Sequence, residues 1–384
     1  MADRPLHILH LTLGADAGGL SRYITDLSLA LHAQGHRITV AGDTGAWQWL
    51  FDKMPFPYIQ IPLKGGPMSF WKSVRAMRAY LRENPIDLIH THYRRATLLG
   101  RKLQRHGGAE RSAAPHSAHS LKIPLLYTLH LSHLSLRFPH NLFSDFGDHT
   151  HVASEEARKW VIDKARVPPS QVSLIPHGVD TDRYAVATPQ QRADARASFD
   201  LAAGDRVAVY VGRLDQFHPK HVEWLVDFAA AARTRMPNLK LLLVGEGPQE
   251  SILREQIARE NLNDRVFLLG YREPLDAYRA ADALLLPSAR EGFSLVCAEA
   301  MSVGVPPLRT RTSGTKELIV ENVTGRSVPV DRDAFIAAAL QFLSDESALR
   351  RMGAAAAELI RKKYTVGQQI SRTMDLYRRL VNEH

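Results

Sequence analysis

The feature that most constrains the fold of this chain is a regular alternation of short aliphatic, β-branched runs with longer amphipathic segments. Such alternation is typical of βαβ units, in which helices join parallel strands. In the first half we predict strands at 7–13, 37–41, 87–91, 124–130, 149–153 and 172–175. Helices are predicted between them at 20–33, 70–83, 94–105 and 154–164.

The second half repeats this alternation, so we expect two doubly wound α/β halves rather than one large sheet. Strands are predicted at 206–211, 239–244, 266–269, 283–286 and 305–308, and helices at 220–235, 248–260, 275–280, 295–303 and 314–319. From Asp331 onward the chain reads as nearly all helix. Polar, alanine-rich residues between Gly178 and Gly204 predict the domain boundary, and Gly107–Ser120 reads as a surface loop.

Length and composition exclude several classes of protein. A chain of 384 residues favours two domains, and its 45% apolar and 23% charged residues are those of a globular protein. A single cysteine, Cys297, excludes a disulfide framework, and no cysteine–histidine cluster has zinc spacing. The apolar runs are too short to span a membrane, and polar residues interrupt any signal peptide. We therefore expect a soluble protein of the reducing cytoplasm.

The positive charge is concentrated in the first half. Residues 1–185 hold 22 lysines and arginines against 15 acidic residues, and segment 64–137 alone holds 13 against three. Such a field attracts anionic lipid, nucleic acid or acidic substrates, although a solvated basic face has the same composition. The segment 70–82 places Phe70, Val74, Met77 and Leu81 on one stripe. That stripe fits an interfacial membrane helix or a helix packed on the sheet, and we favour the second.

Three segments at predicted strand ends could carry chemistry. Gly14–Arg22 contains a Gly-Gly turn that opens a helix, where backbone N–H groups can face an anion. Val211–Lys220 supplies Arg213 and Lys220, two cations suited to phosphate oxygens. Pro287–Met301 places Glu291 in a loop and Glu299 in the following helix, where carboxylates could accept sugar hydroxyls. Each segment alone also has an ordinary structural explanation, as a tight turn, a common loop or a capping acid.

Taken together and in order, the motifs resemble family 4 of the retaining glycosyltransferases. The resemblance rests on Glu291-Gly-Phe-Ser-Leu-x-x-x-Glu299-Ala, Val211-Gly-Arg-Leu with Lys220, Leu243-Val-Gly-Glu-Gly-Pro248, Ile175-Pro-His-Gly-Val-Asp180, the Gly-Gly turn, Ile86-Asp-Leu-Ile-His-Thr-His92 and Tyr127-Thr-Leu-His130. It covers about residues 6–365. It implies the GT-B fold, with two Rossmann-like domains and a C-terminal helix that crosses back to the N-terminal domain. The implied boundaries are 1–180 for the acceptor domain, 181–364 for the nucleotide-sugar domain and 365–384 for the returning helix.

The resemblance also implies roles for individual residues. Arg213 and Lys220 would hold the donor diphosphate, Glu291 the hexose and Glu299 the ribose. His130 would lie near the reacting sugar carbon, so the implied catalytic set is His130, Arg213, Lys220 and Glu291. The remaining implied donor contacts are Gly18, Gly19, Tyr271, Arg272, Gly292, Phe293, Ser294 and Leu295. For the acceptor we single out His92, Arg94 and Arg95; for His92 a purely structural role weighs equally.

The sequence departs from the family pattern at three places. His221 follows Lys220 where the family commonly has glycine, His177 replaces an asparagine, and Thr312–Glu317 lacks the usual proline. Because of these departures, the family pattern does not predict the conformation of the local loops. Asp180-Thr-Asp182 spells a metal signature of another glycosyltransferase fold, which we interpret as coincidence. We expect no metal and no cofactor besides the donor substrate.

The resulting prediction is a retaining enzyme that moves a hexose from a nucleotide-diphosphate sugar, with UDP favoured. The expected acceptor is an envelope glycan, a lipopolysaccharide or a lipid-linked molecule, with peripheral contact to an anionic membrane left open. We expect no nucleic-acid partner, because the basic half lacks interleaved aromatics and any RNA-binding signature. The alternatives are a nucleotide-sugar epimerase or sugar phosphorylase of the same architecture, and a non-enzymatic protein that binds an anionic ligand.

Overall fold

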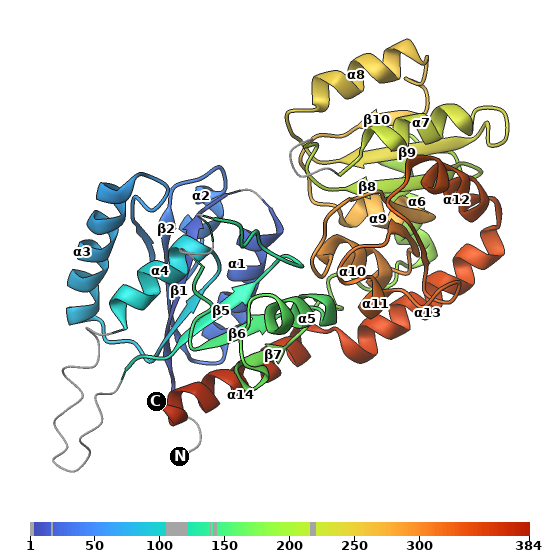
Figure 1. Ribbon diagram of the computed structural model, residues 1–384. Helices are drawn as coiled ribbons and strands as arrows, with labels where there is room; N and C mark the ends of the chain where they lie inside the picture. Colours follow the sequence, from blue (N-terminus) through green and yellow to red (C-terminus); the bar gives the residue numbers. More distant parts are fainter. Residues whose placement is uncertain (1–3, 17, 105–121, 139, 141–143, 216–219) are drawn as a thin grey trace, which may run out of the picture. The chain divides into compact units, whose positions relative to one another are not determined.

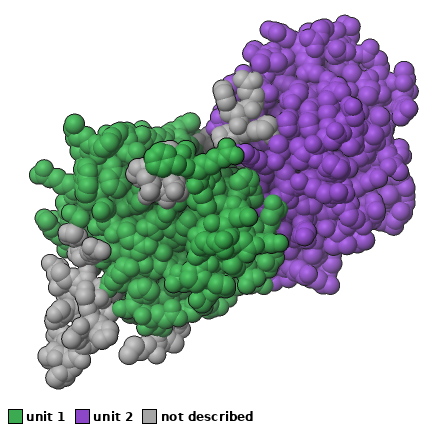
Figure 2. Space-filling view, in the orientation of Figure 1, with its two compact units in different colours: residues 1–175, 369–384 green, residues 176–368 purple. Residues whose placement is uncertain are grey.

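The chain forms two compact units, as seen in a computed structural model that describes residues 4–16, 18–104, 122–138, 140, 144–215 and 220–384 (Figures 1 and 2). The first unit comprises residues 1–175 and 369–384, and the second comprises residues 176–368. The predicted loop Gly107–Ser120 lies outside the described residues. None of the helices in the described ranges is long and apolar enough to cross a membrane.

The first unit contains a parallel sheet of seven strands in the order β3-β2-β1-β4-β5-β6-β7. Its strands are β1 (His7–Gly14), β2 (Arg37–Asp43), β3 (Tyr58–Gln60), β4 (Leu88–Thr91), β5 (Leu125–Leu129), β6 (His149–Val152) and β7 (Val172–Leu174). The helices are α1 (Gly19–Ala33), α2 (Gln48–Asp52), α3 (Pro67–Glu83), α4 (Arg94–Leu103), α5 (Glu155–Asp163) and a short 3-10 turn, η2 (Pro169–Gln171). The predicted α/β alternation is confirmed.

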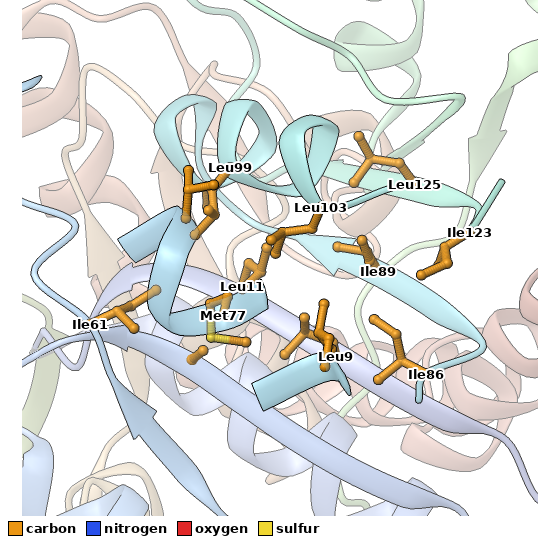
Figure 3. Packing of buried hydrophobic residues seen from close by; sticks show 14 of the residues in the cluster. Leu9, Leu11, Ile61, Met77, Ile86, Ile89, Leu99, Leu103, Ile123 and Leu125 are labelled. Carbon is orange, nitrogen blue, oxygen red and sulfur yellow. The ribbon is translucent and has the colours of Figure 1, made fainter. Parts of the chain in front are cut away.

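One face of this sheet carries a large apolar cluster. Leu9 and Leu11 of β1, Ile89 of β4 and Leu125 of β5 pack against α3 and α4 (Figure 3). Helix α3 contributes the predicted stripe, since Val74, Met77 and Leu81 are buried there and Phe70 packs on the cluster. Because strand side chains alternate between faces, the residues between these point to the opposite side of the sheet.

The opposite face carries buried polar residues of neighbouring strands beside buried aliphatic ones such as Ile8 and Val40. His10 of β1 is paired in register with His90 of β4, and Thr128 of β5 with His151 of β6. The last helix, α14 (Val366–Glu383), covers part of this face, because the Tyr377 hydroxyl lies 2.6 Å from His90 Nδ1. The expected return of the C-terminal helix to the N-terminal domain is thereby confirmed.

The second unit contains a parallel sheet of six strands in the order β10-β9-β8-β11-β12-β13. These are β8 (Arg206–Val211), β9 (Leu239–Val244), β10 (Val266–Leu268), β11 (Ala283–Leu286), β12 (Pro307–Thr310) and β13 (Arg326–Val328). Its helices are α6 (Pro189–Ala197), α7 (Glu223–Ala231), α8 (Glu250–Arg259), α9 (Leu275–Ala280), α10 (Leu295–Ser302), α11 (Thr315–Leu318), α12 (Arg332–Ser344) and α13 (Glu346–Lys363).

The polar stretch after residue 187, expected to be a connection, is helical. Thr188 and Gln191 form a reciprocal capping box at the start of α6. Arg192 and Arg196 on this helix form ion pairs with Asp282, which precedes β11. The predicted helix over 220–235 is shorter than expected and runs from Glu223 to Ala231. Helix α6 was not predicted because ion pairs, and not a broad apolar stripe, attach it to the rest of the unit.

The buried histidines predict how stability depends on pH. Burial lowers the pKa of His10 to about 3 and that of His151 to about 4. An unfolded chain protonates histidine near 6.5, so it binds more protons than the folded chain as the pH falls below that value. We therefore expect the free energy of unfolding to fall between pH 6.5 and pH 4, by on the order of 3 kcal/mol for His151 alone.

Urea denaturation at a series of pH values measures this effect. His151→Gln should reduce the pH dependence of the free energy of unfolding, because glutamine does not titrate. Glutamine can still donate to the carbonyl oxygen of Ile175, which lies 2.7 Å from His151 Nε2. His32→Gln, at an exposed position of α1, serves as the matched control. Equal slopes in wild type and His151→Gln would contradict the assignment.

Candidate functional site

In the second unit, the predicted motifs gather at the carboxyl edge of the sheet, where ligands bind in open parallel sheets. The loops after β8 and β9 touch each other there. Gly245 has φ 140°, and a Cβ at this position would collide with the carbonyl oxygen of Gly212. The close approach of the two backbones therefore explains Gly245, whereas a Cβ at Gly212 would collide with the hydroxyl of Tyr210.

The structure brings together two of the predicted catalytic residues. Lys220, ahead of α7, places its Nζ 2.6 Å from Glu291 Oε1 in the loop after β11. Burial alone would raise the pKa of Glu291, but the positive charges of Lys220 and Arg309 hold it below its ordinary value. Glu291 is therefore an ionised, largely buried carboxylate, able to accept hydrogen bonds from hydroxyl groups.

Arg213 lies in the same loop as Lys220 but is paired differently. Its guanidinium is 3.3 Å from the carboxylate of Asp215, and its side chain is 56% exposed. The hydroxyl of the buried Tyr210 donates to the Arg213 carbonyl oxygen at 3.0 Å and so anchors the loop. The exposure leaves the guanidinium accessible to an anion from solvent.

His221, which takes the usual glycine position after Lys220, has a left-handed backbone with φ 48°. Its ring stacks on Trp224 with centroids 4.1 Å apart, and its Nδ1 lies 3.2 Å from Glu223. These contacts stabilise a conformation that glycine adopts without strain. The loop thus keeps a glycine-like backbone despite the substitution.

The helix that follows Glu291 carries the second predicted carboxylate. Ser294 precedes α10 as its N-cap residue, Leu295 begins the helix, and Glu299 lies one turn further along. The hydroxyl of Tyr278 on α9 donates to Glu299 Oε2 at 3.2 Å. The sequence analysis did not identify Tyr278. Its only indication was a polar hydroxyl group on a helix face that is otherwise buried.

The other predicted donor residues differ in exposure. Phe293, which follows Gly292, is buried, with its ring 5.3 Å from that of Tyr364, so only its backbone could meet a ligand. Tyr271 is 51% exposed, and the Arg272 guanidinium lies over the ring of Phe199 at 5.6 Å.

A second residue that sequence reasoning missed is Arg309 in β12. Its side chain is fully buried and donates to Thr312 Oγ1 at 2.7 Å and to the Ser313 carbonyl oxygen at 3.1 Å. An arginine inside a short apolar strand was the available signal, because such a residue is rarely buried without a partner charge. Its charge contributes to keeping Glu291 ionised.

The Asp180-Thr-Asp182 segment forms a turn. Asp180 Oδ1 accepts from the backbone N–H groups of Asp182 and Arg183 at 3.1 and 3.0 Å. Local turn formation therefore accounts for an aspartate at position 180.

In the first unit, the predicted residues lie at the carboxyl ends of β1, β4 and β5. His92 Nδ1 is 3.1 Å from His130 Nε2, so these two predicted residues are brought together. Gly18 has φ 140° and precedes α1. At Gly19, neither a positive φ nor a described neighbour within 4 Å of a Cβ demands glycine. Local structure thus explains Gly18 but not Gly19.

The two arginines proposed for the acceptor are held by backbone oxygens. Arg94 donates to the Ser135 carbonyl at 2.5 Å, and Arg95 donates to that of Gly66 at 2.8 Å. The Arg95 guanidinium also lies 5.7 Å from the centre of the Phe70 ring. Their predicted contact with an acceptor stays a prediction.

One group of described residues has metal-ligand spacing. The candidate ligand atoms of His10, His90 and His92 lie within 4.8 Å of one another, and all three residues are buried. Both ring nitrogens of His90, however, lie 2.6 Å from hydroxyl oxygens, those of Tyr377 and Thr128. The expectation that the protein needs no metal stays a prediction.

Two family models match the chain, one in each half. The model described as Glycosyltransferase Family 4 matches residues 17–183, and that described as Glycosyl transferases group 1 matches residues 191–359. A D-inositol 3-phosphate glycosyltransferase of Pseudarthrobacter chlorophenolicus is 28% identical over 89% of this chain and 86% of its own. A UDP-Gal:alpha-D-GlcNAc-diphosphoundecaprenol alpha-1,3-galactosyltransferase of Escherichia coli is 25% identical over 80% and 79%.

Solved structures share the fold. HepE of Anabaena in complex with UDP-glucose superposes with a TM-score of 0.79 at 23% identity, over 96% of this chain and 99% of that one. Sucrose-phosphate synthase of Thermosynechococcus elongatus gives the same TM-score and identity over 99% and 100%. These similarities show that the chain has the same fold as the solved structures.

Proposed function

Because the chain belongs to the family 4 glycosyltransferases of the GT-B fold, we propose that it transfers a hexose, with retention, from a UDP-linked donor to a cell-envelope glycan, lipopolysaccharide or lipid-linked acceptor. The solved relative HepE holds UDP-glucose, and the E. coli relative is named for a UDP-galactose donor and a diphosphoundecaprenol acceptor. These relatives support the proposed donor class and the proposed acceptor class.

The observation that carries the proposal is the ion pair between Lys220 and Glu291 at the carboxyl edge of the second sheet. A lysine ammonium has three N–H donors, so Lys220 can hold Glu291 and still donate to a phosphate oxygen. Glu291, kept ionised, can accept from two hydroxyl groups of a hexose. The pair therefore joins a cation for a diphosphate to an acceptor for a sugar.

The proposed chemistry needs no protein nucleophile. The acceptor hydroxyl attacks the sugar carbon on the face that the diphosphate leaves, and a diphosphate oxygen takes the hydroxyl proton. Negative charge grows on the leaving group as the sugar–oxygen bond breaks, and Lys220 with the accessible Arg213 would stabilise that charge. The protein also holds the acceptor hydroxyl close to the sugar carbon on that same face.

The proposed phosphate contacts predict a large loss of turnover. Arg213→Ala and Lys220→Ala should each lower kcat by about 100-fold or more, which is the typical cost of one electrostatic transition-state contact. Release of nucleoside diphosphate from a UDP-sugar panel, with and without acceptor extract, measures the rate. Arg350→Ala, at an exposed cation of α13, is the matched control. Near-normal turnover in both site variants would refute the assignment.

We further propose that the first unit meets the acceptor at an anionic membrane surface. The exposed side of α3 carries Lys72, Arg75 and Arg82 beside Met68 and Trp71, which are 75% and 55% exposed. Basic residues next to an exposed tryptophan are suited to lipid headgroups and the acyl boundary below them.

Vesicle sedimentation tests this contact. The protein should sediment with phosphatidylglycerol-containing vesicles at low salt, and roughly 1 M salt should release it, because the Debye length then falls to about 3 Å. Trp71→Ser should weaken binding, whereas Trp49→Ser, at an exposed tryptophan of α2, should not. Binding equal to that of phosphatidylcholine vesicles would end the proposal.

A further inference from the structure

Three histidines of the first unit form a continuous hydrogen-bonded chain that ends at the predicted catalytic residue. His10 Nδ1 lies 3.0 Å from His92 Nε2, and His92 Nδ1 lies 3.1 Å from His130 Nε2. His10 and His92 are fully buried or nearly so, whereas His130 is partly exposed. The chain therefore leads from the interior of the sheet to its carboxyl edge.

Each link requires one nitrogen with a hydrogen and one without. Burial lowers the pKa of His10 to about 3 and holds that of His92 well below its ordinary value, so both rings are neutral near pH 7. A neutral imidazole carries one N–H, so the tautomer of one ring dictates that of the next. The hydrogen-bonded chain of the three histidines therefore has only two arrangements. In outward donation each ring donates to the next in the direction from His10 to His130, and in inward donation each ring donates in the direction from His130 to His10.

The buried end of the chain selects between these arrangements. His10 Nε2 is inaccessible to solvent and has no hydrogen-bond partner among the described residues. If the chain donated inward, this nitrogen would carry a buried, unpaired N–H, which folded proteins rarely contain. With outward donation it holds only an unpaired lone pair, and the hydrogen of His10 lies on Nδ1, facing His92.

Neighbouring aromatic rings keep the imidazoles in place. Tyr23 of α1 presents its ring edge-on to His130, with centroids 4.9 Å apart and planes at 73°, and to His92 at 5.8 Å and 71°. The ring of His90 lies 4.3 Å from that of His92. His92 thus has little room to turn its ring over.

We propose that His10 and His92 are positioning residues that hold His130 as the Nδ1–H tautomer, with Nε2 accepting from His92. His130 then presents an N–H donor, rather than a lone pair, to an oxygen of the reacting sugar or its acceptor. That last step rests on the proposed function, whereas the tautomer itself does not. No net proton moves along the chain.

The metal-ligand spacing of His10, His90 and His92 provides a competing explanation with a distinct signature. In a metal site that used the nitrogens of His10 and His92 that face each other, both would lack hydrogen, because a ligating nitrogen uses its lone pair. In the proposed chain, one of them carries a hydrogen. The two explanations therefore differ at His10 Nδ1.

Nitrogen-15 correlation spectra of the full chain, labelled at histidine, report the tautomers directly. Spectra of His10→Asn, His92→Gln and His130→Gln assign the signals. We expect all three residues to show a protonated Nδ1 and an unprotonated Nε2 at pH 7.5. The opposite tautomer at His130, a charged ring, or unprotonated nitrogens on both sides of the His10–His92 contact would overturn the proposal.

Variants of His92 connect the tautomer to catalysis. His92→Leu removes the donor to His130 Nε2, so His130 should become a mixture of tautomers and kcat should fall roughly 10-fold with a smaller change in KM. His92→Asn can place an amide N–H where Nδ1 was and should restore both. His149→Gln, on the same sheet but outside the chain, controls for general loss of stability.

The readouts separate the two possible failures. If His92→Leu unfolds the protein, the wild-type and His92→Asn spectra still decide the tautomer. If the tautomer is as proposed but no UDP-sugar is turned over, the proposed function fails and the positioning chain stands. If Arg213→Ala and Lys220→Ala abolish turnover while His130 carries its hydrogen on Nε2, only the positioning chain fails.

Discussion

A largely buried carboxylate stays ionised only where cations face it, and this constraint organises the second unit. Glu291 follows β11 and Lys220 follows β8, two strands that are neighbours in the sheet although more than 70 residues separate their loops in the chain. The ion pair therefore exists only when the parallel sheet has formed with β8 beside β11. Arg309 from β12, on the far side of β11, adds a second positive charge. Losing either cation would leave an incompletely compensated buried charge, which costs several kcal/mol.

The first unit also buries neutral groups. His10, His90 and His151 on β1, β4 and β6 are buried imidazoles whose pKa values burial lowers, whereas Lys72, Arg75 and Arg82 lie on the exposed side of α3. A field of exposed cations can attract an anionic surface without desolvation, whereas neutral donors inside the sheet can be aimed at a substrate without a charge penalty. We infer from this division that the second unit binds the charged donor and that the first unit presents hydrogen-bond donors to an acceptor.

The sequence alone was sufficient to predict the fold, because the motifs occur in a fixed order at the ends of strands that alternate with helices. It paired neither Glu291 with Lys220 nor His92 with His130, since those contacts depend on which strands become neighbours. Tyr278 and Arg309 went unnoticed because each supports a site residue from a strand or helix without a recognisable motif. Helix α6 was misread because ion pairs to Asp282 replace the apolar stripe that reveals most helices.

The most direct test of the central claim is a crystal structure of the chain with a UDP-sugar donor bound. The diphosphate should lie against the second unit, with its oxygens within hydrogen-bond distance of the Arg213 guanidinium and the Lys220 ammonium, and with the hexose hydroxyls on Glu291. A diphosphate bound elsewhere, with Lys220 still paired to Glu291 alone, would contradict the account.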